Sequence, residues 1–133
     1  LSKLDSFIAG RRHIAHERNR MLAGVPGLIL PFEPADCYHS YYLYTCRVKD
    51  EWAGAKRDQL MATFEKEFGF RCVIANPPVY ANRKQLAEHT RGQSNPVTEH
   101  LAKTIFCVPL HPAMPDADNK YICAAIITAM SRL

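Results

Sequence analysis

The residue types best suited to metal binding or nucleophilic catalysis occur as two cysteine–histidine pairs. Cys37 and His39 are separated by one residue, and Cys107 and His111 by three. A thiolate beside an imidazole is typical of half a zinc site or of an activated cysteine nucleophile. A structural zinc site needs four ligands, and the five cysteines include no CxxC motif that would supply a second matched pair. The sequence therefore favours coincidence over a metal site or a Cys/His catalytic pair.

The composition indicates an ordinary globular protein. A chain of 133 residues with 47% hydrophobic residues fits one domain with a real core. The cysteine count is odd and most cysteines lie in apolar runs, which indicates reduced, buried thiols rather than a disulfide framework. There is no apolar stretch of about 18 residues and no charged-then-apolar leader, so we expect a cytoplasmic protein without a membrane partner.

The basic residues do not form a strong nucleic-acid signal. The net charge is only +4, and the densest basic run, Arg11, Arg12, Arg18 and Arg20, is diluted by Glu17. Nucleic-acid readers concentrate positive charge on one face or stripe. We interpret the run as a solvated helix face and expect no nucleic-acid partner; a small basic RNA-binding domain is the weakest alternative.

Hydrophobic periodicity predicts strands that alternate with helices. Gly69 is suited to ending one helix, and Asn95-Pro96 to starting another as N-cap and first helical residue. Helices are predicted over 1–24, 57–68, 96 to about 104, and from 116 onward; strands are predicted over 28–30, 39–48, 70–75 and 105–110. This order predicts one small sheet with helices packed against it.

Two segments fall between these elements. Residues 49–54 are predicted as a loop. Residues 76–93 have no clear period, start with Asn-Pro-Pro and end in a polar stretch. A loop of that length in a compact domain is more often functional than idle.

Several segments, in order along nearly the whole chain, together resemble the C-terminal third of DegT/DnrJ/EryC1/StrS aminotransferases. KLDSFIAGRRHIAHERNRML is similar to the family's linker helix, K-L-x-x-x-I-x-x-R-R-x-I-A. CYHSYYLYTCRV, RDQLMATFEKEFGFRC and ANPPVY resemble its H/S-x-Y/W-x-L/Y-x-x-x-V, R-D-x-L-x-x-x-L-x-x-x-G-I and Y-P-x-P-L-H segments. NPVTEHLAKTIFCVPLHPAMPDADNKYICAAI resembles the closing pattern, P-V-A/T-E-x-L-A, then S-L-P-L-H-P, then D-x-D.

The resemblance implies an α/β fold of the fold-type I class, in which a small, mainly antiparallel sheet carries helices packed on it. Residues 1–133 would be the small C-terminal domain, with 1–24 the linker helix from a large domain. The chain opens inside an amphipathic pattern without an initiator methionine, so we expect it to be part of a longer protein. Family members act as homodimers that transfer an amino group, usually from glutamate, to a keto group on a nucleotide-linked sugar.

The family's cofactor, pyridoxal phosphate, is held in the large domain through a Schiff-base lysine. Such a lysine must be positioned and desolvated so that it is unprotonated. No lysine here lies in the serine- and histidine-bearing context of the family's lysine; each falls in a helix pattern or polar loop that looks solvent-facing: Lys3, Lys49, Lys56, Lys66, Lys84, Lys103 and Lys120. We therefore expect no catalytic residue, no bound cofactor and no transamination by the isolated chain, although its parent protein would be an enzyme.

The segment that matches a pocket-facing loop of the family is 76–80. Tyr80 falls where the family usually has a histidine, and Asn76 where a tyrosine is common. A phenol can hydrogen-bond a sugar hydroxyl or a phosphate and offers an apolar face, so we predict Tyr80 and Asn76 as substrate-binding residues. His111 is interpreted as a structural turn residue.

His89 and Arg91 lie in the irregular segment and could reach a phosphate, but we make no prediction for them.

Two alternatives for the whole chain stay open. The chain could be a stand-alone α/β binding or interaction module derived from the same family, or it could belong to another fold-type I family such as the amino-acid aminotransferases.

Overall fold

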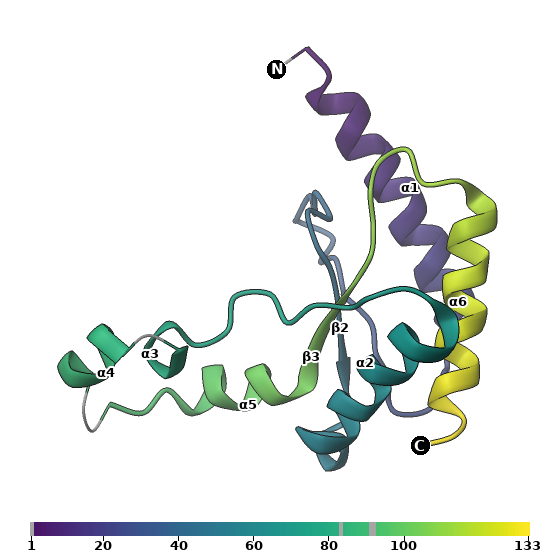
Figure 1. Cartoon of the computed structure of the whole chain (residues 1–133). Helices are drawn as coiled ribbons and strands as arrows, with labels where there is room; N and C mark the ends of the chain where they lie inside the picture. Colours follow the sequence, from purple (N-terminus) through teal and green to yellow (C-terminus); the bar gives the residue numbers. More distant parts are fainter. Residues whose placement is uncertain (1, 83, 91–92) are drawn as a thin grey trace.

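The computed structural model describes residues 2–82, 84–90 and 93–133, with the backbone alone for residues 81, 82, 84 and 87. Three antiparallel strands, β1 (Leu28–Ile29), β2 (Tyr44–Val48) and β3 (Ile105–Val108), form one sheet in the order β1-β2-β3. Cys46 is paired with Phe106 at the centre of the β2–β3 register. Helices pack on this sheet, so the predicted fold class is confirmed (Figure 1).

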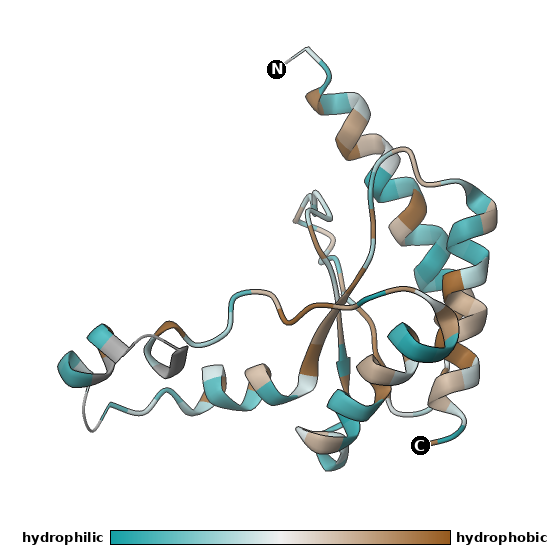
Figure 2. Ribbon diagram, viewed as in Figure 1, coloured by the Kyte–Doolittle hydropathy of each residue, from teal (hydrophilic) through white to brown (hydrophobic). Residues whose placement is uncertain are grey.

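The two faces of β2 have different neighbours. Successive strand residues point to opposite faces, and Tyr44, Cys46 and Val48 are buried while Thr45 and Arg47 are partly exposed. The buried face meets three helices, α1 (Leu4–Leu22), α2 (Ala55–Phe68) and α6 (Asp116–Met130), of which α6 contacts both others. Figure 2 shows apolar residues along β3 and α6, whereas much of α2 is hydrophilic.

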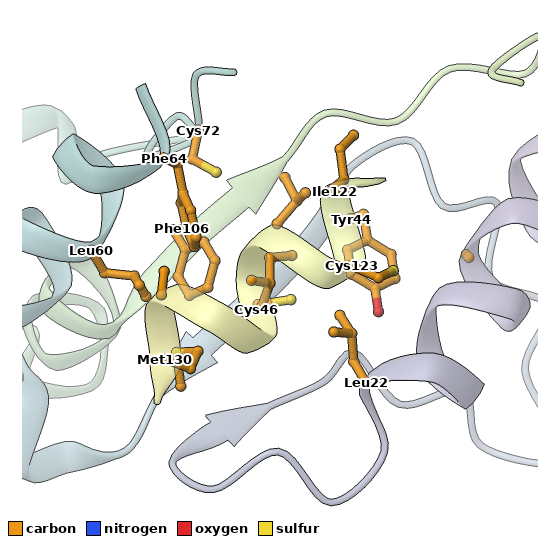
Figure 3. Close-up of a cluster of buried hydrophobic side chains, with 14 of the residues drawn as sticks. Leu22, Tyr44, Cys46, Leu60, Phe64, Cys72, Phe106, Ile122, Cys123 and Met130 are labelled. Atoms are coloured by element: carbon orange, nitrogen blue, oxygen red, sulfur yellow. The ribbon is translucent and has the colours of Figure 1, made fainter. Parts of the chain in front are cut away.

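The core lies between the sheet and these three helices. Its side chains come from every layer, as Figure 3 shows: Leu22, Tyr44, Cys46, Leu60, Phe64, Cys72, Phe106, Ile122, Cys123 and Met130. The predicted apolar stripe of α6 is confirmed, because Ile126 and Ala129 are buried beside these residues. The core cysteines are free thiols, and burial raises the pKa of Cys72 to about 12, so they act as small hydrophobes.

Helix α1 covers the core only with its C-terminal half. Ile14, Ala15 and Leu22 are buried, whereas Leu4 and Phe7 are 48% and 45% exposed. The expectation that Arg18 lies on a solvated face is wrong. Arg18 is fully buried, where its Nε donates to Asn119 Oδ1 (2.9 Å), its Nη2 donates to the Pro109 carbonyl (3.0 Å) and its guanidinium lies 4.7 Å from the Tyr44 ring centroid. These contacts offset part of the desolvation of the charge; burial still lowers the pKa of Arg18.

Residues 76–104 form an arm that extends away from the sheet in Figure 1. It contains two short helices, α3 (Val79–Asn82) and α4 (Lys84–His89), and the longer α5 (Pro96–Thr104), which leads directly into β3. The sequence predicted an irregular segment over 76–93, so the two short helices are a correction; residues 83, 91 and 92 lie outside the described residues. No helix within the described residues is long and apolar enough to cross a bilayer.

Two strand predictions are wrong in extent. The strand expected over 70–75 is reduced to one bridge, Val73 with Cys107, beyond which Asn76 turns at a φ of +52°. The strand expected over 39–48 begins only at Tyr44, because Tyr41 has a φ of +47° and its N–H donates to His39 Nδ1 (2.8 Å). Residues predicted as a loop over 49–54 include a 3-10 helix, η1 (Asp50–Trp52).

Candidate functional site

A wide groove among the described residues lies on the arm. It is a groove of about 720 Å³ between the start of α3 and the start of α5. Its walls are residues 76–80 on one side and Asn95 and Thr98 on the other. The two predicted site residues, Asn76 and Tyr80, therefore line one groove, which is lined on the same side by Pro77, Pro78 and Val79.

Tyr80, which lines this groove, is paired with Glu99. The Tyr80 hydroxyl donates to Glu99 Oε1 (3.1 Å), and the backbone N–H of Asn95 donates to the same oxygen (3.0 Å). Glu99 lies in the first turn of α5, where the helix dipole favours a negative charge. The pair thus connects the start of α3 to the start of α5 across 19 residues of sequence.

Asn95 is the N-cap residue of α5 and Pro96 is in its first turn, as predicted, but the Asn95 side chain makes no capping hydrogen bond. The Glu99 carboxylate instead reaches back to accept the backbone N–H of Asn95, which is the glutamate half of a capping box. The Asn95 amide is therefore left to line the groove.

Burial raises the pKa of the Tyr80 phenol above its ordinary value of 10, and the hydrogen bond to Glu99 and the negative charge of Glu99 raise it further. Tyr80 is thus protonated at neutral pH. Because a phenol has a single proton, and that proton is engaged by Glu99, the hydroxyl oxygen retains only acceptor capacity for a further partner.

Asn76 stands at the mouth of the groove with an exposed side chain. Its left-handed backbone conformation is one that asparagine tolerates far better than most non-glycine residues. Asn76 also borders a second, smaller hollow of about 230 Å³ between β2 and α5, which includes Thr45 and Leu101.

The direction of α5 is set by a buried arginine at the base of the arm. Arg57 on α2 is 3% exposed, and its Nη1 donates to the carbonyls of Ala102 (3.1 Å) and Ile105 at the end of α5. The N–H of Gly54 donates to the Lys103 carbonyl (2.8 Å). These bonds satisfy carbonyls that a helix C-terminus leaves without intrahelical partners.

His89 and His111 do not line the groove among the described residues. His111 is exposed, and its carbonyl accepts the N–H of Met114 (3.1 Å) in a turn, consistent with a structural residue. His89 is exposed at the end of α4. Arg91 lies outside the described residues.

Neither cysteine–histidine pair has the surroundings of a metal or catalytic site. Cys107 is buried with its Sγ 3.2 Å from Thr45 Oγ1, whereas His111 faces solvent. Cys37 is exposed, and His39 Nδ1 accepts the N–H of Tyr41. Within the part of the chain that the structure describes, no three histidine, cysteine or acidic side chains are arranged to hold a metal ion.

The described lysines do not fit the role of a pyridoxal phosphate lysine, which must be desolvated. Five of them are exposed: Lys3, Lys56, Lys66, Lys103 and Lys120. Lys49 is partly exposed, with its ammonium 4.6 Å from the Trp52 ring centroid. The side chain of Lys84 lies outside the described residues. No chemical step through this cofactor follows from these side chains.

Sequence reasoning missed Asn95 and Thr98, which line the groove, and Glu99, which binds the Tyr80 hydroxyl. From the P-V-T-E segment, the sequence predicted only the start of a helix and part of the family resemblance. The available signal was the spacing: Glu99 is four residues after Asn95, so its carboxylate can reach back to the exposed N–H at the helix start. Nothing in the sequence indicated that Tyr80 meets Glu99.

Comparisons with known proteins agree with the resemblance. The family model described as the DegT/DnrJ/EryC1/StrS aminotransferase family matches residues 1–127. A transaminase from Micromonospora megalomicea subsp. nigra, dTDP-3-amino-3,4,6-trideoxy-alpha-D-glucose transaminase, is 30% identical over 98% of this chain and 35% of its own length.

Solved structures share the fold. The aminotransferase TlmJ from Streptoalloteichus hindustanus superposes with a TM-score of 0.85 at 26% identity, over 99% of this chain and 34% of that protein. NtdA from Bacillus subtilis, solved with bound cofactor PMP, has a TM-score of 0.80 at 17% identity, over 94% of this chain and 28% of that protein.

The chain therefore spans about a third of the length of the curated relatives it matches. The family model covers nearly all of it, and the helices and the antiparallel sheet superpose on solved aminotransferases. The chain belongs to the DegT/DnrJ/EryC1/StrS aminotransferase family.

Proposed function

We propose that this chain is the C-terminal domain of a pyridoxal-phosphate-dependent aminotransferase that acts on a keto nucleotide-sugar. In this proposal residues 1–133 form the small domain and residues 1–24 link it to a larger, cofactor-bearing part. The domain covers the substrate side of the active site and is not catalytic alone. The amino donor is glutamate, the working enzyme is a cytoplasmic homodimer, and neither nucleic acid nor membrane is a partner.

The observation that carries the proposal is the match of residues 1–127 to the family together with coverage of only about a third of its relatives. A dTDP-amino-sugar transaminase among those relatives supports the substrate class. The exposure of the described lysines supports a cofactor held by other polypeptide. When bound there, the cofactor carries the amino group between the donor and the keto sugar.

The groove supports the assignment of a substrate side. Tyr80 and Asn76 line it on an arm that extends beyond the sheet, where it can face a neighbouring part of the enzyme (Figure 1). We assign both residues to substrate binding: Tyr80 through its phenol oxygen and ring, and Asn76 through its exposed amide. Neither is assigned a catalytic step.

The test is a chimera in which this chain replaces the matching third of the Micromonospora relative. We expect the chimera to bind pyridoxal phosphate and to aminate a keto dTDP-sugar with glutamate as donor. The matched control is the same relative truncated before that third, which should show no turnover. An inactive chimera that is dimeric and cofactor-loaded would refute the proposal, because it would combine an intact cofactor site with a domain that does not complete the active site.

A stand-alone binding module is the second candidate, in which the groove lined by residues 76–80, Asn95 and Thr98 would bind its ligand without a second polypeptide. It predicts that the 133-residue protein alone binds a nucleotide-sugar. Titration with a dTDP-sugar, followed through the tyrosine resonances, separates the two candidates. Micromolar binding to the isolated chain favours the module, and its absence favours the domain of a larger enzyme.

A further inference from the structure

We propose that the first half of α1 and residues 32–42 form a docking surface whose occupant is the larger, cofactor-bearing part of the same enzyme. This surface, called the aromatic face, consists of Leu4, Phe7, Arg11, Arg12, Tyr38 and Tyr42. The inference rests on the proposed function and assigns a contact surface separate from the groove on the arm. Among the described residues, these six belong neither to the buried core nor to the groove walls.

The first half of α1 has little cover from this chain. Between Leu4 and His13, a stretch that the structure describes completely, no residue is fully buried. Figure 1 shows this half of the helix extending past the end of α6. Its one very close neighbour is Pro112, which packs directly on Gly10. Because a helix in a protein is stabilised mainly by packing of its apolar side, the exposed Leu4 and Phe7 indicate a missing surface.

Residues 32–42 add aromatic rings beside the same half of α1. The Arg12 guanidinium lies 4.0 Å from the Tyr38 ring centroid, and that of Arg11 lies 5.8 Å from the Tyr42 ring centroid. Both rings are nevertheless 70% and 71% exposed, respectively. Arg11 is four residues after Phe7 and therefore on the same side of the helix. The helix and the segment thus present one continuous surface.

A polar network holds the segment in place against α1. The Glu33 carboxylate accepts hydrogen bonds from Arg12 Nη1 and from the His39 N–H (2.8 Å), and His16 Nε2 lies 3.3 Å from its other oxygen. Arg12 Nη1 also donates to the His39 carbonyl (2.8 Å). The His39 ring stacks on buried Tyr41 at 4.1 Å between centroids. A segment fixed in this way pays little ordering entropy when a partner docks.

The length of the relatives indicates the occupant. This chain covers 35% and 30% of two curated relatives, so about two thirds of such a polypeptide is available to cover the aromatic face. The family match over residues 1–127 includes both parts of the face. Rigid tyrosines beside arginines are typical of the centre of a protein–protein interface. Glu33 and Asp36 offset Arg11 and Arg12, so the face has no strong positive field that would favour a nucleic acid.

The first measurement compares the isolated 133-residue chain with the active-site chimera described above. Tetranitromethane nitrates exposed tyrosine rings, and peptide mass spectrometry locates the nitrated residues. We expect Tyr38 and Tyr42 to be nitrated in the isolated chain and protected in the chimera. Tyr121 is the matched control, because it is 54% exposed on α6, away from the aromatic face, and should react in both proteins.

The second measurement uses the double variant Tyr38→Ser/Tyr42→Ser in both proteins. Because both rings are exposed, the melting temperature of the isolated chain should change little, whereas that of the chimera should fall clearly. Tyr121→Ser is the control, and its effect on the chimera should be no larger than its effect on the isolated chain. A double variant that lowers both melting temperatures equally would overturn the inference.

Two further outcomes would overturn the inference, and the first needs only the isolated chain. Protection of Tyr38 and Tyr42 that increases with the concentration of the 133-residue chain, together with a dimer in solution, would show that a second copy occupies the face. Free nitration of both residues in the chimera would show that its larger part does not. If the face is protected in an inactive chimera, the proposed function fails and the docking surface stands. If an active chimera leaves both tyrosines reactive, the proposed function stands and the docking surface fails.

Discussion

Replacing Arg57 by methionine is expected to loosen the whole arm, because this side chain joins the end of α5 to α2. Methionine retains an unbranched apolar stem of similar length, so the change removes mainly the guanidinium bonds. Those bonds go to the carbonyls of Ala102 and Ile105, and a third goes to Asp58 (2.7 Å). The candidate groove depends on this anchor, since α5 carries Thr98, one of the residues that line it.

The magnitude follows from the two carbonyl bonds. Each hydrogen bond from a charged donor contributes about 1.5–3 kcal/mol. The lower value applies because a helix-end carbonyl that loses its partner can bind water. Two such bonds give a loss of about 3 kcal/mol in the free energy of unfolding. The Asp58 carboxylate is 62% exposed, so its pairing with Arg57 contributes little.

The assay is urea unfolding, combined with amide hydrogen exchange over 96–104. We expect Arg57→Met to lower the free energy of unfolding by about 3 kcal/mol and to speed exchange in α5 by roughly a hundredfold. Arg57→Lys should recover part of both, because an ammonium can still donate to a carbonyl. A loss below about 0.5 kcal/mol, with α5 exchange unchanged, would refute the anchoring role.

Three further perturbations are expected to act at separate places. The hydrogen bond from Arg12, followed by that from the His39 N–H, lowers the pKa of Glu33 from 4.5 to about 2. The stabilisation from Glu33 is therefore complete above pH 4.5 and is lost as the pH falls towards 2. Urea unfolding should show that the free energy of unfolding falls less between pH 7 and pH 3 in Glu33→Gln than in the wild type. Asn76→Val should cost about 1–2 kcal/mol by urea unfolding because φ is positive there, whereas Asn76→Gly should cost little. Gly10→Ala should lower the melting temperature, because its Cβ would lie 2.5 Å from the Pro112 carbonyl oxygen; an unchanged value would contradict that close packing.

The sequence predicted the core elements well because their patterns are local. The stripe Ile122, Ile126 and Ala129 on α6, and the end of α2 at Gly69, follow directly from helical period and glycine conformation. The prediction of a strand over 70–75 was wrong because an apolar run of this length also occurs in irregular segments at a sheet edge, and here only Val73 pairs, in a single bridge. Periodicity alone does not separate these cases.

The burial of Arg18 could not be predicted from the sequence pattern for a different reason. Arg18 lies in a basic run that suits a solvated face, yet its partners Asn119 and Pro109 are 101 and 91 positions away in the sequence. Only the packing of α1 against α6 brings them together. Long-range partners of this kind leave no local signal.

In the candidate site, too, some residues could be predicted from the sequence and others could not. The position of Asn76 and Tyr80 in one segment followed from the family resemblance, and they share a groove. Glu99 was missed because its contact with Tyr80 depends on how the arm folds back from α3 to α5.

The account depends most on the claim that the cofactor is held by polypeptide other than these residues. The direct measurement is borohydride reduction of the 133-residue protein mixed with pyridoxal phosphate, followed by peptide mass spectrometry. The account predicts only low, distributed labelling of surface lysines. Stoichiometric labelling of one lysine, Lys84 included, would contradict it.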